Sequence, residues 1–174
     1  MQLAITALGN NPTNFIYKIL DAVSSCNCNV LTLKSSCLDQ TTACYLLVNG
    51  NWNQIAKLES ALDSLQVLLK INIHSLRPDN TLKKPESTPY FLESISVSPN
   101  RIIENMSSFL LDREIVIEEI NARCYQPCYT QTQVFSVKFI LSIPIKLKIR
   151  TLRNDLNEFS DTLNIDTLFD PITQ

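Results

Sequence analysis

Apolar residues along this chain follow two spacings, one typical of half-buried strands and one typical of amphipathic helices. Near the start, Leu3, Ile5 and Ala7 alternate, which predicts a strand. A break follows at residues 9–12, and Thr13 is placed to cap the next helix. That helix is predicted from apolar residues three and four positions apart, which are Phe15, Ile16, Ile19, Leu20 and Val23.

The rest of the first half completes the order βαββαβ. Residues 27–29 end the first helix, and two strands over residues 30–33 and 43–48 are predicted on either side of a polar turn at residues 39–40. Asn51 can cap a second helix, in which Trp52 is interpreted as a packing anchor. Residues 69–73 alternate again and predict the closing strand.

The second half repeats this order. Strands are predicted at residues 91–97, 115–120, 134–141 and 165–169, and helices at 102–110 and 149–159. Pro12 and Pro99, Ile16 and Ile103, and Val30 and Ile117 are each 87 positions apart. In the second helix of each half, Ile55, Leu58, Leu62 and Leu65 match Ile149, Leu152, Leu156 and Phe159 at an offset of 94.

The repeat predicts an α+β chain of two ferredoxin-like βαββαβ domains in tandem. Each would have an antiparallel four-stranded sheet with two helices on one face. We expect a first domain over residues 1–76, a linker rich in proline and polar residues over 77–89, and a second domain over 90–174. Exposed sheet edges are pairing templates, so we expect the two halves to pair edge to edge or sheet to sheet, with a homodimer left open.

Composition narrows the function classes. The 174 residues are 45% hydrophobic and 18% charged, with a net charge of −2, which argues against a dedicated nucleic-acid binder. No apolar run is long enough to span a membrane, and the N-terminus lacks the features of a signal peptide, so we expect a cytoplasmic protein.

Glycine and histidine are scarce. Two glycines, Gly9 and Gly50, exclude a P-loop and a Gly-x-Gly-x-x-Gly fingerprint, since both need several glycines in one turn. The one histidine, His74, lies beyond the last predicted strand of the first half and is interpreted as an exposed residue before the linker. Without a nucleophile, base and orienting group, we expect no catalytic residues and no cofactor, and hence no enzyme.

The same residues carry a family resemblance. The chain resembles tandem ACT domains and, more narrowly, the glycine cleavage system transcriptional repressor family. The resemblance rests on residues 24–30, on residues 49–55 around Trp52, on Leu58-Glu59, and on a long C-terminal run that includes residues 135–144, 152–156, 163–166 and Asp170-Pro171. It covers almost the whole chain.

This resemblance implies a function. By this resemblance, the protein would be a repressor that does not bind DNA itself. It would bind a LysR-type transcription activator of the glycine cleavage operon, and glycine would weaken that contact. The ACT ligand turn typically reads Asp-x-Pro-Gly, whereas this chain has Asn10-Asn11-Pro12-Thr13 and Ser98-Pro99-Asn100. A Cβ in place of the glycine narrows the space for a ligand.

A zwitterionic amino acid would be bound best at the two strand-to-helix turns. The first N–H groups of a helix are unsatisfied and carry the positive end of its dipole, so they suit a carboxylate. The candidate ligand-binding residues are Asn10, Asn11, Pro12, Thr13 and Asn14 in the first domain, and Ser98, Pro99, Asn100 and Arg101 in the second. The alternative interpretation of these residues is that they are ordinary turn residues.

The cysteines and one basic cluster remain. Cys26 and Cys28 form a C-x-C pair and Cys124 and Cys128 a C-x-x-x-C pair, neither with the usual zinc-knuckle spacing, so we expect no metal and mainly structural thiols.

The basic residues Lys146, Lys148, Arg150 and Arg153 are interpreted as a solvated surface, with docking of an acidic partner as the alternative.

Two function classes stay open at this point. One is a non-enzymatic regulatory protein that binds a small amino acid, a protein partner, or both. The other is an interaction or structural protein that keeps the ACT fold after losing its effector pocket.

Overall fold

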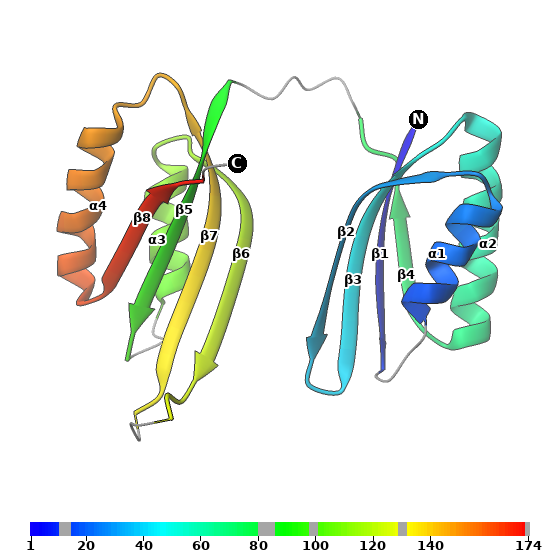
Figure 1. The fold of residues 1–174 in the computed structure, drawn as a ribbon, viewed down its shortest axis with the longest axis horizontal. Coiled ribbons are helices and arrows are strands. Elements are labelled where there is room, and N and C mark those ends of the chain that lie inside the picture. Colours follow the sequence, from blue (N-terminus) through cyan, green and yellow to red (C-terminus); the bar gives the residue numbers. More distant parts are fainter. Residues whose placement is uncertain (11–14, 80–85, 98–100, 129–131, 173–174) are drawn as a thin grey trace. The chain divides into compact units, whose positions relative to one another are not determined.

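The computed structural model describes residues 1–10, 15–79, 86–97, 101–128 and 132–172, and Figure 1 shows its elements. The chain divides into two compact units, Met1–Lys83 and Lys84–Gln174. In each unit two helices cover one face of a four-stranded antiparallel sheet, which confirms the predicted α+β ferredoxin-like class. The domain boundaries themselves stay a prediction.

The first unit has the predicted βαββαβ order. Its elements are β1 (Gln2–Asn10), α1 (Phe15–Ser25), β2 (Asn29–Leu38), β3 (Thr41–Asn49), α2 (Trp52–Leu69) and β4 (Asn72–Leu76). The strands lie in the order β2-β3-β1-β4. The closing strand begins later than predicted because α2 continues to Leu69 and ends at Lys70, whose backbone is left-handed. His74 therefore lies inside β4, although its side chain is exposed as expected.

The second unit repeats the topology. Its elements are β5 (Ser87–Ser96), α3 (Ile102–Leu111), β6 (Val116–Tyr125), β7 (Val134–Pro144), α4 (Ile149–Leu163) and β8 (Asp166–Pro171), with strand order β6-β7-β5-β8. Strand β5 begins at Ser87, so it takes in the end of the segment predicted as linker.

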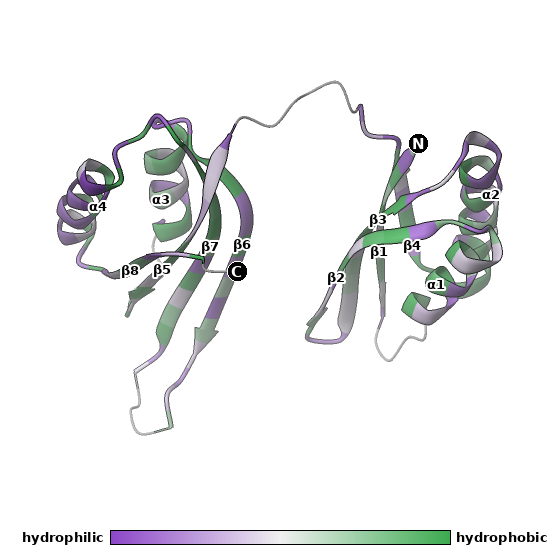
Figure 2. Ribbon diagram, turned by 45° about the horizontal axis from the view of Figure 1, so that its top comes forward, coloured by the Kyte–Doolittle hydropathy of each residue, from purple (hydrophilic) through white to green (hydrophobic). Residues whose placement is uncertain are grey.

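Each unit has its own core between sheet and helices. In the first, Leu3 and Ile5 of β1 are fully buried against Ile55 and Leu58 of α2, as their spacing predicts. In the second, Phe139 of β7 is fully buried in the corresponding cluster. Figure 2 shows green, hydrophobic residues along the strands and purple, hydrophilic residues on α4.

The internal repeat extends to backbone irregularities. The register of the edge pair shifts between Val30 and Thr32 in the first unit and between Ile117 and Glu119 in the second, again 87 positions on. Left-handed residues recur in the same way, with Asn27 matching Glu114 and Lys70 matching Asn164. The repeat therefore includes the bulges and left-handed turns as well as the order of the elements.

Helix α2 begins as predicted and differs in one respect. Asn51 caps it with a capping box, since its side chain accepts from the Gln54 N–H at 2.9 Å and the Gln54 side chain accepts from the Asn51 N–H at 2.7 Å. Trp52, however, is 62% exposed, so its interpretation as a packing anchor is wrong. The first position of a capped helix faces solvent here, and the apolar stripe starts at Ile55.

Candidate functional site at the turns and between two helices

The predicted ligand turns lie partly within the described chain. Asn10 is the last residue of β1, pairs with Thr41 and is exposed. Arg101 precedes α3 in a left-handed conformation with φ of 57°, and its Nε donates to Glu104 Oε2 at 2.7 Å. Asn11, Pro12, Thr13 and Asn14, and likewise Ser98, Pro99 and Asn100, lie outside the described residues. The ligand site therefore stays a prediction.

Gly9 allows the end of β1 to pack closely against its neighbours. A Cβ built on Gly9 would lie 2.6 Å from Ile71 Cγ2 and 3.2 Å from Phe15 Cε1. Phe15 opens α1 and Ile71 lies between α2 and β4. The absent side chain thus lets the start of α1 and the segment after α2 close over the end of β1.

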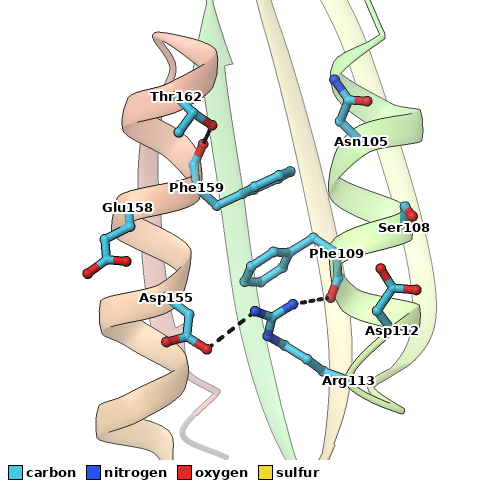
Figure 3. A pocket seen from close by; sticks show the side chains of 9 residues that line it. All are labelled: Asn105, Ser108, Phe109, Asp112, Arg113, Asp155, Glu158, Phe159 and Thr162. Carbon is cyan, nitrogen blue, oxygen red and sulfur yellow. Dashed lines mark hydrogen bonds and ion pairs between the residues drawn. The ribbon is translucent and has the colours of Figure 1, made fainter.

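A groove lies between α3 and α4 on the helical face of the second unit, with a volume of about 640 Å³ (Figure 3). Phe109 of α3 and Phe159 of α4 point toward each other across it, and their rings stack with centroids 4.7 Å apart and an interplanar angle of 22°. Polar residues surround this aromatic pair, namely Asn105, Ser108, Asp112, Arg113, Asp155, Glu158 and Thr162.

Arg113 lies within this groove. Its guanidinium carbon is 3.8 Å from the centroid of the Phe109 ring, and its two terminal nitrogens reach Phe109 O at 3.2 Å and Asp155 Oδ2 at 3.3 Å. A cation over an aromatic face, held by a carboxylate, is a favourable arrangement. Asp112 and Glu158 have no ion-pair partner among the residues that the structure describes.

A second hollow, of about 520 Å³, lies on the helix-free face of the sheet in the same unit. It is lined by Phe91, Glu93, Glu119, Asn121, Arg123, Tyr125, Ser136, Lys138 and Ile140. Glu93 accepts from Ser136 Oγ at 2.8 Å and pairs with Lys138 Nζ at 3.5 Å, so its charge is compensated within the sheet face.

The predicted basic cluster is solvated, since all four side chains are exposed. Lys146 pairs with Glu114, and this contact lowers the pKa of the Glu114 carboxyl. Arg153 Nη2 lies 3.8 Å from Asp170 Oδ1. Local acids thus neutralise half of the cluster.

Among the described residues, no group of three or more histidine, cysteine or acidic side chains could hold a metal ion. The six cysteines are free thiols. No helix in the described ranges combines the length and apolarity needed to cross a membrane.

Thiol labelling should separate the cysteines by burial. Burial raises the pKa of Cys28 and of Cys44, which lowers their thiolate fraction, whereas Cys37, Cys124 and Cys128 are exposed. We expect iodoacetamide at pH 8 to modify the three exposed thiols well before the two buried ones, as read by peptide mass spectrometry over time. Equal rates for Cys44 and Cys124 would contradict this burial.

Comparison with known proteins gives three similarities. Residues 1–75 match the family model of the ACT domain. The glycine cleavage system transcriptional repressor of Escherichia coli (strain K12) is 26% identical over 121 residues, which is 70% of this chain and 64% of that relative. The match thus spans less than two thirds of the relative's length.

Two solved structures share the fold over 99% of this chain and 98% of theirs. One, named for a glycine cleavage system transcriptional repressor, has a TM-score of 0.75 at 15% identity. The other, an unknown protein from Galdieria sulphuraria, has a TM-score of 0.82 at 17% identity. At such low identities, these similarities show the fold of the two units and no shared function.

These findings confirm the resemblance to ACT domains and to the glycine cleavage system transcriptional repressors. Residues 1–75 match the ACT domain family model, and the chain resembles the glycine cleavage system transcriptional repressors in sequence and in fold.

Proposed function

We propose that this chain is a non-enzymatic regulatory protein that represses transcription by binding a LysR-type activator. The observation that carries the proposal is the similarity to the Escherichia coli repressor. At 121 residues that match is longer than either unit of this chain, so it includes residues of both. A protein of this kind works where transcription takes place, which in a bacterium is the cytoplasm.

The charge of the chain supports contact with a protein rather than with DNA. Its net charge is −2, and the basic residues at the start of α4 are partly neutralised by neighbouring acids. Neutralising phosphates supplies most of the affinity of DNA-binding proteins, and this chain offers little for that purpose. Repression would then be a protein–protein equilibrium with the activator.

Glycine is the proposed modulator of that equilibrium. If glycine weakens the contact with the activator, linkage requires the activator to weaken the binding of glycine by the same factor. The proposed site is the first strand-to-helix turn, residues 10–14, with residues 98–101 of the second unit as its counterpart.

Capture of the activator tests the proposal. The full chain, immobilised, is incubated with extract of its native cells, and bound proteins are identified by mass spectrometry. We expect a LysR-type activator to be retained and to be released by millimolar glycine, and not by the same concentration of L-glutamate. Retention of no transcription regulator would contradict the proposed function.

Thermal unfolding tests amino-acid sensing separately. A ligand that binds only the native state at ten times its Kd stabilises it by about 1.4 kcal/mol, which is about 6–11 °C in Tm for a unit of this size. We expect glycine to raise the Tm of the parent and of the Asn53→Leu control, whose position on α2 is exposed, but not of Asn11→Leu. No shift with any small amino acid would favour the alternative, an ACT-fold interaction protein without sensing.

A further inference from the structure

The groove between α3 and α4 is lined by aromatic and acidic residues that the fold itself does not need. The repeat supplies an internal comparison, because each groove residue has a counterpart in the first unit at an offset of 87 on α3 or 94 on α4. Phe109 and Phe159 correspond to Ala22 and Leu65. The carboxylates Asp112, Asp155 and Glu158 correspond to Ser25, Ala61 and Ser64. The same fold is thus built in the first unit without the aromatic pair or these three acids, although Asp21 stands there at the position of Ser108.

The charges in this groove are unbalanced toward the negative. Asp112 lies just beyond the end of α3, while Asp155 and Glu158 lie on α4 (Figure 3). Arg113 forms an ion pair with one of these three carboxylates, that of Asp155. Asp112 and Glu158 are exposed and, within the described ranges, form no ion pair. The groove therefore carries negative charge toward solvent at both helices.

Arg113 also shows which chemical group fits there. Its guanidinium carbon lies 3.8 Å from the centroid of the Phe109 ring, and the guanidinium donates to Phe109 O and to Asp155 Oδ2. Phe159, half-buried on the opposite helix, has no such cation over its ring among the cation–π contacts of the described chain. A second guanidinium or ammonium group would find an aromatic surface in a groove that is also lined by carboxylates left unpaired within the described chain.

We propose that this groove binds a basic segment of a protein partner, with an arginine or lysine that packs against Phe159 in the groove that Asp112, Asp155 and Glu158 line. Charge complementarity and the aromatic pair favour a cationic side chain, and a volume of about 640 Å³ accommodates more than one side chain. The inference rests on the proposed function, since it names the chemistry of the partner surface through which a contact-based repressor acts.

Peptide binding to the full chain tests the groove directly. The probe is a fluorescein-labelled amphipathic peptide with two arginines one helical turn apart, and a second peptide has glutamates in their place. We expect the arginine peptide to bind, with affinity that falls as salt rises, and the glutamate peptide not to bind. Free argininamide should bind at least tenfold more weakly than the peptide. Equal affinity of argininamide and peptide would overturn a protein segment in favour of a small organic cation.

Matched variants locate the contact. Exposed ion pairs are individually weak, so Asp112→Asn combined with Glu158→Gln should raise the peptide's Kd about three- to tenfold. Phe159→Leu, which installs the residue found in the first unit, should raise it about threefold or more without opening a large cavity. The control, Asp21→Asn combined with Asp63→Asn on the exposed faces of α1 and α2, should change it less than twofold. Equal weakening in the control, or none in the groove variants, would overturn the proposal.

Activator capture separates failure of the groove from failure of the function. If the parent retains the activator and the groove variants retain it equally, the groove is not the partner surface although the proposed function stands. If the arginine peptide binds the groove but no activator is captured, the groove binds basic segments and the proposed function fails. Circular dichroism of each variant, expected to match the parent, confirms that folding is intact.

Discussion

Truncation of Phe139 to alanine should lower the free energy of unfolding of the second unit by about 3–5 kcal/mol. The Phe139 side chain is fully buried in β7, which lies between β6 and β5 in the sheet. Removing its ring leaves a cavity that the flanking strands, held in register on both sides, cannot close. Since a domain of this size is stable by only about 5–15 kcal/mol in total, much of that stability is lost.

Urea unfolding followed by circular dichroism measures this loss, and hydrogen exchange assigns it to a unit. We expect amides of β5–β8 to lose protection, with those of β1–β4 as the internal reference. Leu111→Ala is the matched control, because Leu111 is 62% exposed at the end of α3 and its truncation should cost no more than about 0.5 kcal/mol. Similar losses for Phe139→Ala and Leu111→Ala would contradict the described core.

Hydrophobic spacing predicted the fold because most elements bury one regular stripe. Leu3, Ile5 and Ala7 alternate in sequence and are buried in β1, and Ile55, Leu58 and Leu62 are buried along α2. The offsets of 87 and 94 then carried the order of the first half onto the second. The spacing of apolar residues within one helix or strand can be observed in a single sequence, so these elements could be predicted without an alignment.

Element ends were predicted less well, for a backbone reason. Lys70 and Glu114 adopt left-handed conformations with φ of 53° and 57°, where glycine or asparagine would be the usual signal. Because Lys70 carries no such signal, the end of α2 was placed too early and β4 with it. The residue that corresponds to Lys70 at the end of α4 is Asn164, which does carry the usual signal. The start of β8, predicted at residue 165, is accordingly next to the observed start at Asp166.

The groove of the second unit was missed because its residues each have an ordinary interpretation alone. Phe109 and Phe159 fit the apolar stripes of α3 and α4, and Asp155 and Glu158 fit the polar positions of α4. Their meeting depends on how α3 and α4 are spaced across the sheet, which no periodicity encodes. Comparison of Phe159 with Leu65 at the offset of 94 is the one sequence signal that could have found it.

Replacement of Gly9 by alanine should destabilise the first unit by about 1–3 kcal/mol through overpacking. The backbone of Gly9 is not left-handed, so the cost comes from space rather than from backbone strain. The new Cβ would lie 2.6 Å from Ile71 Cγ2, and the Ile71 side chain is buried at 5% exposure. The Ile71 N–H also donates to Gln66 O at 3.3 Å, which holds this segment against α2.

A double-mutant cycle with Ile71→Leu shows whether that contact is the cause. Leucine branches at Cγ and therefore lacks the methyl group that meets the new Cβ, so it should relieve part of the clash. We expect Gly9→Ala combined with Ile71→Leu to be more stable than the sum of the single changes predicts, by about 0.5–3 kcal/mol in urea unfolding. Strict additivity would mean that Phe15, whose Cε1 and Cδ1 lie 3.2 and 3.3 Å from the same Cβ, carries the overpacking instead. In that case the close approach at the end of β1 is set by the start of α1 and not by the segment that follows α2.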